Sequence, residues 1–154
     1  MIKLLKKKKS FDLRTKIVNT LMTSGKKKTG EKILLKSMKN LQRSTTKNSK
    51  SVLQLAIINS TPTFKLNEQI VKKGKRKAVK ITPSFIIKDS LRIMTSLKLI
   101  KTTASKNKSA DKFDQIIAKE LMASALLKSQ SVNKKNELQK QVLMNKRYLS
   151  KFRW

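Results

Sequence analysis

Apolar residues recur at helical spacing in six segments of this chain, which predicts six amphipathic helices. The segments contain Ile17, Val18, Leu21 and Met22; Ile33, Leu34, Met38 and Leu41; residues 52–58; Leu91, Met94 and Leu97; Phe113, Ile116, Ile117, Leu121 and Ala125; and Leu138, Val142, Asn145 and Leu149. Each stripe is wide enough to cover one side of a helix, so the stripes can share one core. The pattern therefore predicts a mainly α protein.

Residues with capping preferences suggest where these helices begin and end. Gly25 is a natural C-cap for the first helix, and Thr29 can cap the second. We expect the third helix to end near Asn59 and the fourth to be capped by Asp89. Residues 101–109 are polar and basic, and they predict a loop before the fifth helix.

One segment breaks the helical pattern and predicts a β-hairpin at about residues 63–82. Two extended runs flank a turn that contains Gly74, and Pro83 is expected to end the second strand. Five of the six residues at 72–77 are cations, namely Lys72, Lys73, Lys75, Arg76 and Lys77. Because such side chains cannot be buried against an apolar core, the tip is expected to project into water or against a polyanion.

These elements predict a single domain. It comprises about six helices at residues 11–154, with one protruding β-hairpin arm and a basic N-terminal arm at residues 1–10 that carries Lys6, Lys7, Lys8 and Lys9. A length of 154 residues is typical of one domain.

The charge of the chain decides which partners are plausible. Lysine and arginine number 39 against eight acids, for a formal net charge of +31. Such an excess repels itself and is relieved by a polyanion, of which nucleic acid is the commonest. An anionic membrane surface is the rival, but it requires an apolar anchor.

The absence of cysteine and histidine lowers the prior for an enzyme. The chain has neither residue, so it lacks disulfides, the usual zinc ligands and the commonest general base. Asp111 and Asp114 lie one helical turn apart, but acids at a helix start usually interact with the helix dipole. The six other acids stand singly and are expected to pair with nearby lysines; they are Asp12, Glu31, Glu68, Asp89, Glu120 and Glu137. We expect no catalytic site, no metal, no cofactor and no small-molecule substrate.

Residues 25–32 superficially resemble a phosphate-binding P-loop. The motif requires Lys and then Ser or Thr after its second glycine, whereas Glu31 follows Gly30 here. A nucleotide site is therefore not expected at this segment.

No apolar run approaches the roughly 18–20 residues that span a bilayer. The first nine residues are basic but lead into no apolar stretch of a secretory signal, and they lack the Arg-rich pattern of an organellar import sequence. The abundance of Lys, Ile and Asn is typical of an AT-rich genome such as an organelle's. We therefore expect a protein that, if it works in an organelle, is made there.

The lysines gather in clusters that exceed an ordinary solvated surface. Aromatic residues make up only 5% of the chain and are not interleaved with the cations, so phosphate contacts on a folded RNA fit better than base stacking. The candidate RNA-contacting residues are Lys6, Lys7, Lys8, Lys9, Lys26, Lys27, Lys28, Lys72, Lys73, Lys75, Arg76, Lys77, Lys80, Arg92, Lys134, Lys135, Lys146, Arg147 and Arg153.

Several motifs, in order, resemble the family of the seventh small-subunit ribosomal protein. The first consists of Ile17-Val18, six residues, Gly25-Lys26-Lys27, five residues, Ile33-Leu34, two residues and Ser37. The others are Ala56-Ile57-x-Asn59 with Pro62; the basic hairpin; Val132-Asn133-Lys134-Lys135-Asn136-Glu137; and Asn145-Lys146-x-Tyr148 with Phe152-Arg153-Trp154. The resemblance covers about residues 11–154. The hairpin departs from the family's Arg-Arg-Val-Gly-Gly-x-x-Tyr pattern, with Lys72, Lys73 and Gly74 in its place.

The resemblance implies a helical domain with a protruding hairpin that binds the 3′ major (head) domain of the small-subunit rRNA early in head assembly. It also implies neighbouring small-subunit ribosomal proteins as partners, and a hairpin near the exit-site tRNA and the mRNA exit path. Carried over by position, Lys26, Lys27, the hairpin cations, Lys134, Lys135 and Arg153 become RNA contacts. The short ending and the coding bias look like those of a mitochondrially encoded member.

Other hypotheses remain open at the level of the sequence. A general cationic protein that binds or condenses nucleic acid would bind duplex DNA as well as folded rRNA. A membrane-active cationic protein would gain helicity on lipid without RNA, and an enzyme is the least supported class.

Overall fold

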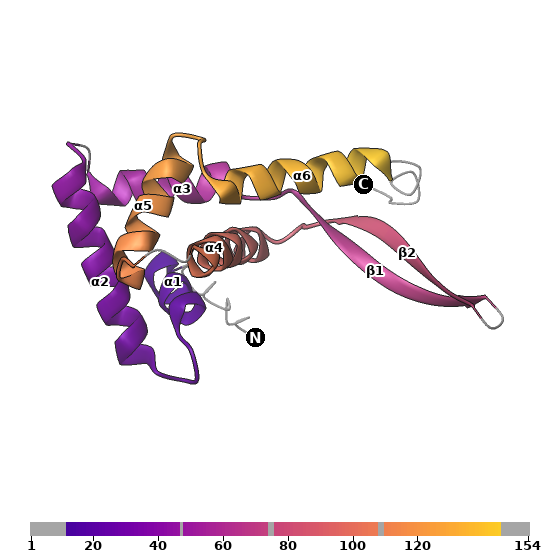
Figure 1. Cartoon of the computed structure of the whole chain (residues 1–154), viewed down its shortest axis with the longest axis horizontal. Helices are drawn as coiled ribbons and strands as arrows, with labels where there is room; N and C mark the ends of the chain where they lie inside the picture. The colour runs from indigo at the N-terminus through magenta and orange to yellow at the C-terminus, as the bar shows by residue number, and fades with distance from the viewer. Residues whose placement is uncertain (1–11, 47, 74–75, 108–109, 146–154) are drawn as a thin grey trace, which may run out of the picture.

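The computed structural model describes residues 12–46, 48–73, 76–107 and 110–145. Along these residues the order of elements is α1 (Leu13–Leu21), α2 (Lys27–Ser44), α3 (Ser49–Ser60), β1 (Phe64–Lys73), β2 (Arg76–Phe85), α4 (Asp89–Lys106), α5 (Phe113–Ala125) and α6 (Gln130–Met144). Figure 1 shows a helical body from which the two strands extend as an arm, with α2 at the opposite end. The six predicted helices and the hairpin are confirmed.

The core forms around α5, which packs against α2, α3 and α4. The apolar stripes predicted from the sequence supply most of it. Leu41 and Ala56 are fully buried, and Val18, Ile100 and Leu121 are almost so. Burying a side chain of this size stabilises a fold by about 1.5–3 kcal/mol, so the shared core is what holds the six helices together.

Small hydroxyl side chains occupy several helix crossings that an apolar pattern cannot reveal. Ser37, Ser60 and Ser96 are fully buried. The Ser60 hydroxyl donates to the Ala56 carbonyl one turn earlier, at 2.8 Å, whereas the Ser96 hydroxyl donates across to the Ile57 carbonyl of α3, at 3.1 Å. Because each hydroxyl finds a carbonyl, these helices approach closely without an unsatisfied polar group.

The turn between α1 and α2 differs from the prediction. α1 ends at Leu21 with Met22 as its C-cap, and Gly25 lies further along the loop at φ +73°, where glycine adopts the left-handed conformation without strain. α2 begins at Lys27, two residues before Thr29, and Lys26 precedes it without a side-chain capping bond. Thr29 is therefore a first-turn residue and not the N-cap.

The fourth helix is longer than predicted. α4 continues through residues 101–106, which the polar composition had assigned to a loop, and Lys88 rather than Asp89 precedes its first turn. Thr103 and Ala104 face the core and are fully buried. Tertiary packing on these two residues outweighs the polar appearance of the segment.

The hairpin is antiparallel and pairs Phe64 with Phe85 at its base and Lys73 with Arg76 near its tip. Pro83 does not end the second strand: it lies within β2 opposite Leu66 and is buried. A two-stranded ribbon leaves one edge of each strand without a partner strand, so a residue that lacks an N–H group is tolerated there.

No helix in the described part of the chain is both long and apolar enough to cross a membrane.

Candidate nucleic-acid interface

Few of the cations have a carboxylate partner in the structure. Two ion pairs join described residues, Arg92 with Asp89 at 3.8 Å and Lys119 with Asp111. The first lies at the surface, where such pairs contribute little to stability. The excess charge of the described residues is therefore mostly left for an external anion.

The remaining acids do not behave as sequence reasoning expected. Asp12 caps α1 by accepting hydrogen bonds from the Arg14 and Thr15 backbone, and the bond from the Thr15 hydroxyl is the largest cause of a lowered Asp12 pKa. Glu120 is only 6% exposed, and no described lysine pairs with it. These two carboxylates serve helix ends and helix packing, which spacing to the nearest lysine cannot reveal.

Glu120 belongs to a buried polar network where α4, α5 and α6 meet. Its Oε1 accepts hydrogen bonds from the Thr103 hydroxyl at 3.1 Å and from the Ser131 backbone at 3.2 Å. The Ser124, Ser129 and Ser131 hydroxyls contact one another at 2.7–2.9 Å in the same place. This network holds the start of α6 on the body, and so it sets the position of the cations on that helix.

The loop before α2 presents three consecutive cations. Lys26, Lys27 and Lys28 are exposed. They lie at the N-terminal end of α2, whose first turn contains no acid, so their charge adds to the positive end of the helix dipole. The arrangement suits contact with phosphate groups, as predicted for these residues.

The hairpin brings its cations together along the backbone. Its register places Lys72 opposite Lys77 and Lys73 opposite Arg76, next to the turn. Like charges at directly opposite positions of a ribbon are destabilising. Such an arrangement favours an anion near the tip. Of the predicted contacts here, Lys75 lies outside the described residues, and Lys72, Lys73, Arg76, Lys77 and Lys80 are described for their backbone alone.

Arg92 connects the hairpin base to α4. Its guanidinium lies 4.8 Å from the centre of the Phe85 ring, its Nε donates to the Ile86 carbonyl at 2.7 Å, and its side chain is 27% exposed. Phe85 in turn meets Phe64 edge to face, with the ring centres 5.6 Å apart. Arg92 was predicted as an RNA contact, and in the structure its side chain fixes the direction in which the hairpin leaves the body.

The start of α6 carries Lys134 and Lys135, both half-buried. The Lys135 ammonium donates to the Asn59 carbonyl in the last turn of α3, at 2.7 Å. Part of its donor capacity is thus used inside the protein. The predicted contacts Lys6, Lys7, Lys8, Lys9, Lys146, Arg147 and Arg153 lie outside the described residues.

Two sets of cations escaped the sequence reasoning. The Lys101 ammonium donates to the Thr20 carbonyl at 2.7 Å, at the C-terminal end of α1, and no local pattern reveals that long-range contact. The outer face of α2 carries Lys32, Lys36, Lys39 and Arg43, all exposed. Their spacing of three or four residues was a readable signal, but only consecutive cations had been counted as clusters.

The P-loop-like segment has a packing role. Gly30 is buried inside α2, and a Cβ atom there would lie 3.2 Å from the Val18 carbonyl oxygen of α1. The glycine therefore allows α1 and α2 to approach closely. Its position in the third turn-forming residue set of a helix, rather than in a loop after a strand, does not suit a phosphate cradle.

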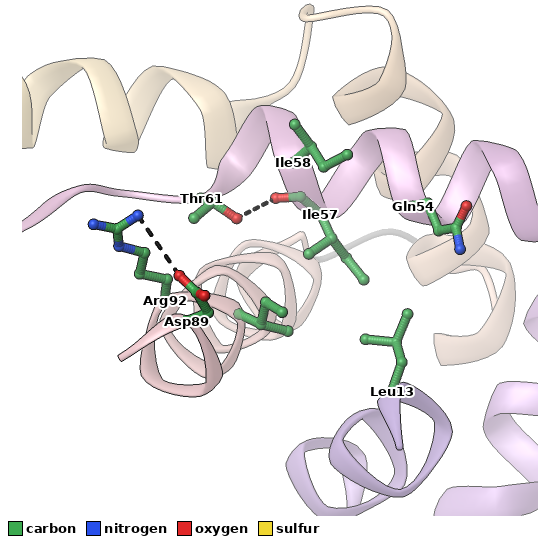
Figure 2. Close-up of a pocket in the computed structure, with 8 residues that line it drawn as sticks. Leu13, Gln54, Ile57, Ile58, Thr61, Asp89 and Arg92 are labelled. Atoms are coloured by element: carbon green, nitrogen blue, oxygen red, sulfur yellow. Dashed lines mark hydrogen bonds and ion pairs between the residues drawn. The ribbon is translucent and has the colours of Figure 1, made fainter. Parts of the chain in front are cut away.

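A hollow of about 640 Å³ opens between α1, α3 and α4, and Figure 2 shows its lining. Leu13, Ile57 and Ile58 make most of its surface apolar, and the Asp89–Arg92 ion pair lies at its rim. The Thr61 hydroxyl donates to the Ile57 carbonyl at 2.6 Å and is not poised as a nucleophile. No group of three acidic, histidine or cysteine residues that could hold a metal occurs among the described residues.

Comparisons with known proteins agree with the motifs. The family model of ribosomal protein S7p/S5e matches residues 3–146. The chain is 28% identical over 142 residues to small ribosomal subunit protein uS7c of Euglena longa, covering 90% of this chain and 77% of the relative. It is 26% identical over 140 residues to small ribosomal subunit protein uS7 of Mycoplasma mobile, covering 91% of this chain and 85% of the relative.

Proposed function

Since the chain belongs to the ribosomal protein S7p/S5e family and is a structural constituent of the small ribosomal subunit, we propose that it binds the 3′ major (head) domain of the small-subunit rRNA and supports assembly of the head. The observation that carries this proposal is the uncompensated charge. Of a net +31, two ion pairs account for the described carboxylate–cation contacts. A folded RNA supplies the missing negative charge, and the counterions released from its phosphates drive binding.

The mechanism is positioning by phosphate contacts and involves no reaction. The exposed lysines before α2, the basic tip of the hairpin and the first turns of α6 reach RNA in different directions from one rigid body. Contacts of lysine with phosphate fix register and orientation without reading the sequence of bases. A protein that joins several RNA segments in this way stabilises the junction between them.

The binding test is a salt series with the full chain and a transcript of the head domain. A protein that neutralises six to ten phosphates loses about three to five orders of magnitude in affinity between about 50 and 200 mM salt. Duplex DNA of similar length is the control, because a general condensing protein would bind it equally well. Equal affinity for both nucleic acids, or a flat salt dependence, would reject the proposal.

We also propose that the hairpin lies near the exit-site tRNA and the mRNA exit path, beside neighbouring small-subunit proteins. The projecting ribbon with cations near its turn supports this placement, because only an arm can reach beyond the rRNA that the body contacts. A variant with Ser at Lys72, Lys73, Lys75, Arg76 and Lys77 should keep its helical circular dichroism and lose crosslinks to tRNA in reconstituted subunits. Crosslinks that persist unchanged would remove the hairpin from this path.

The organelle is a separate proposal. The lysine-rich coding bias supports a protein made and used in a mitochondrion. Sedimentation of mitochondrial extracts on a sucrose gradient tests it, with detection by an antibody to the chain. We expect the protein with the small ribosomal particles at physiological ionic strength, and its recovery only from another compartment would contradict the placement.

A further inference from the structure

The outer face of α2 carries an unbroken line of cations, which we name the α2 ridge. It consists of Lys28, Lys32, Lys36, Lys39 and Arg43, and all five residues are exposed. Successive members are three or four residues apart, so at about 100° per residue they fall within about 80° of one another around the helix. The ridge is about 22 Å long at 1.5 Å per residue.

The ridge points away from the protein core. The buried residues of α2 are Gly30, Leu34, Ser37 and Leu41, and they pack against α1, α3 and α5. On the same angular scale, this buried face is centred nearly opposite the ridge. No ion pair among the described residues involves α2, so the ridge cations repel their neighbours along the helix.

We propose that the α2 ridge is a second RNA-binding surface, which holds the sugar–phosphate backbone of an RNA segment other than the one at the hairpin. The proposal rests on the function proposed above. Figure 1 shows α2 at one end of the long axis and the hairpin at the other. A strand of nucleic-acid duplex carries a phosphate about every 3.4 Å along its axis. A backbone that runs along α2 therefore offers a phosphate within reach of each flexible cation.

The chemistry of the ridge favours RNA over an acidic protein. Four of the five residues are lysines, which are depleted at protein–protein interfaces and suited to sequence-independent phosphate contacts. Leu35 is the exposed large apolar residue of α2, at 58%, and one such residue does not form an apolar patch. A membrane surface is disfavoured because insertion requires an apolar face, and that of α2 is buried in the body.

The test compares two variants of the full chain with equal loss of charge. The ridge variant carries Gln at Lys32, Lys36, Lys39 and Arg43, while the control variant carries Gln at Lys50, Lys98, Lys112 and Lys128. The control positions are all exposed and lie on separate parts of the surface. Both variants should keep the helical circular dichroism of the wild type, because Gln is a good helix former.

The readouts are the salt dependence of binding to the head-domain transcript and hydroxyl-radical footprints. Four lost phosphate contacts at a slope of about 0.9 each should shrink the change in affinity between about 50 and 200 mM salt by roughly 100-fold. The control variant should change it far less. A footprint should disappear from one RNA segment in the ridge variant and from a different segment in the hairpin variant. Arginine at Lys32, Lys36 and Lys39 should preserve both readouts.

The outcomes separate this proposal from the one it rests on. Equal salt dependence of the ridge and control variants, with wild-type binding intact, would overturn the ridge proposal alone. Unchanged RNA binding with loss of a ribosomal protein from reconstituted particles would also overturn it, in favour of a protein partner. A wild-type chain that does not bind the transcript would overturn the proposed function itself.

Discussion

Replacement of Gly30 by alanine opposes two effects of similar size. Alanine is favoured over glycine within a helix by about 1 kcal/mol. The new Cβ, however, would lie 3.2 Å from the Val18 carbonyl oxygen and 3.4 Å from the Met22 nitrogen. These two backbone atoms hydrogen-bond each other at 2.8 Å in the last turn of α1, so neither can move away alone.

The steric effect is expected to win. Forcing an extra methyl group into a packed site costs about 1–3 kcal/mol when the surroundings cannot yield. The expected net loss is about 1 kcal/mol, which corresponds to a fall of about 2–4 °C in the melting temperature of a domain of this size. Calorimetry of the full chain in sulfate measures it, since sulfate screens the lysines and strengthens burial.

The control is Asn136→Ala, at an exposed position within α6. It gains helix propensity without a new contact, so it should raise the melting temperature slightly. If Gly30→Ala raised the melting temperature as much as the control does, the close approach of α1 and α2 would be refuted. The P-loop-like glycine would then need another explanation.

Three further perturbations test the buried contacts and the caps. Glu120→Ala should lower the free energy of unfolding by about 2–3 kcal/mol in urea titrations, because the Ser131 N–H loses its buried acceptor, and Glu120→Gln should lose less; equal losses would implicate the charge itself. Lys101→Met should destabilise α1 by about 1–2 kcal/mol, seen as faster hydrogen exchange in its last turn, whereas Lys128→Met should not. Asp12→Ala should lower the melting temperature at neutral pH. Because the folded Asp12 pKa is lowered, the difference from the wild type should fade as the pH falls below the ordinary value of 3.8, and a constant difference would contradict the cap.

The number of helices and the hairpin could be predicted because burial of apolar residues dominates their formation. Leu41, Leu121 and their neighbours recur at a helical period and do face the core. Helix ends were less predictable, since several residues near an end compete for the cap. At the first turn Gly25 adopts the left-handed conformation, but three residues beyond the C-cap.

Polar residues inside the protein were the main failure of sequence reasoning. Ser37 and Ser96 are buried because a carbonyl on another helix accepts their hydroxyls, a fact of tertiary structure with no local signature. Glu120 was expected to meet a lysine for the same reason and is instead held by backbone and hydroxyl donors. The candidate interface was predicted better, because runs of lysine before α2 and at the hairpin are visible in any window of the sequence.

Two lysines show how a chain so poor in acids stabilises positive charge internally. The Lys101 and Lys135 ammonium groups donate to carbonyls at the C-terminal ends of α1 and α3. Each helix end carries about half a negative elementary charge, so the main chain acts as a resident counterion where a carboxylate would otherwise stand. Acetylation of either amine would therefore loosen the scaffold itself, whereas acetylation of an outward-facing lysine would alter only the attraction to RNA.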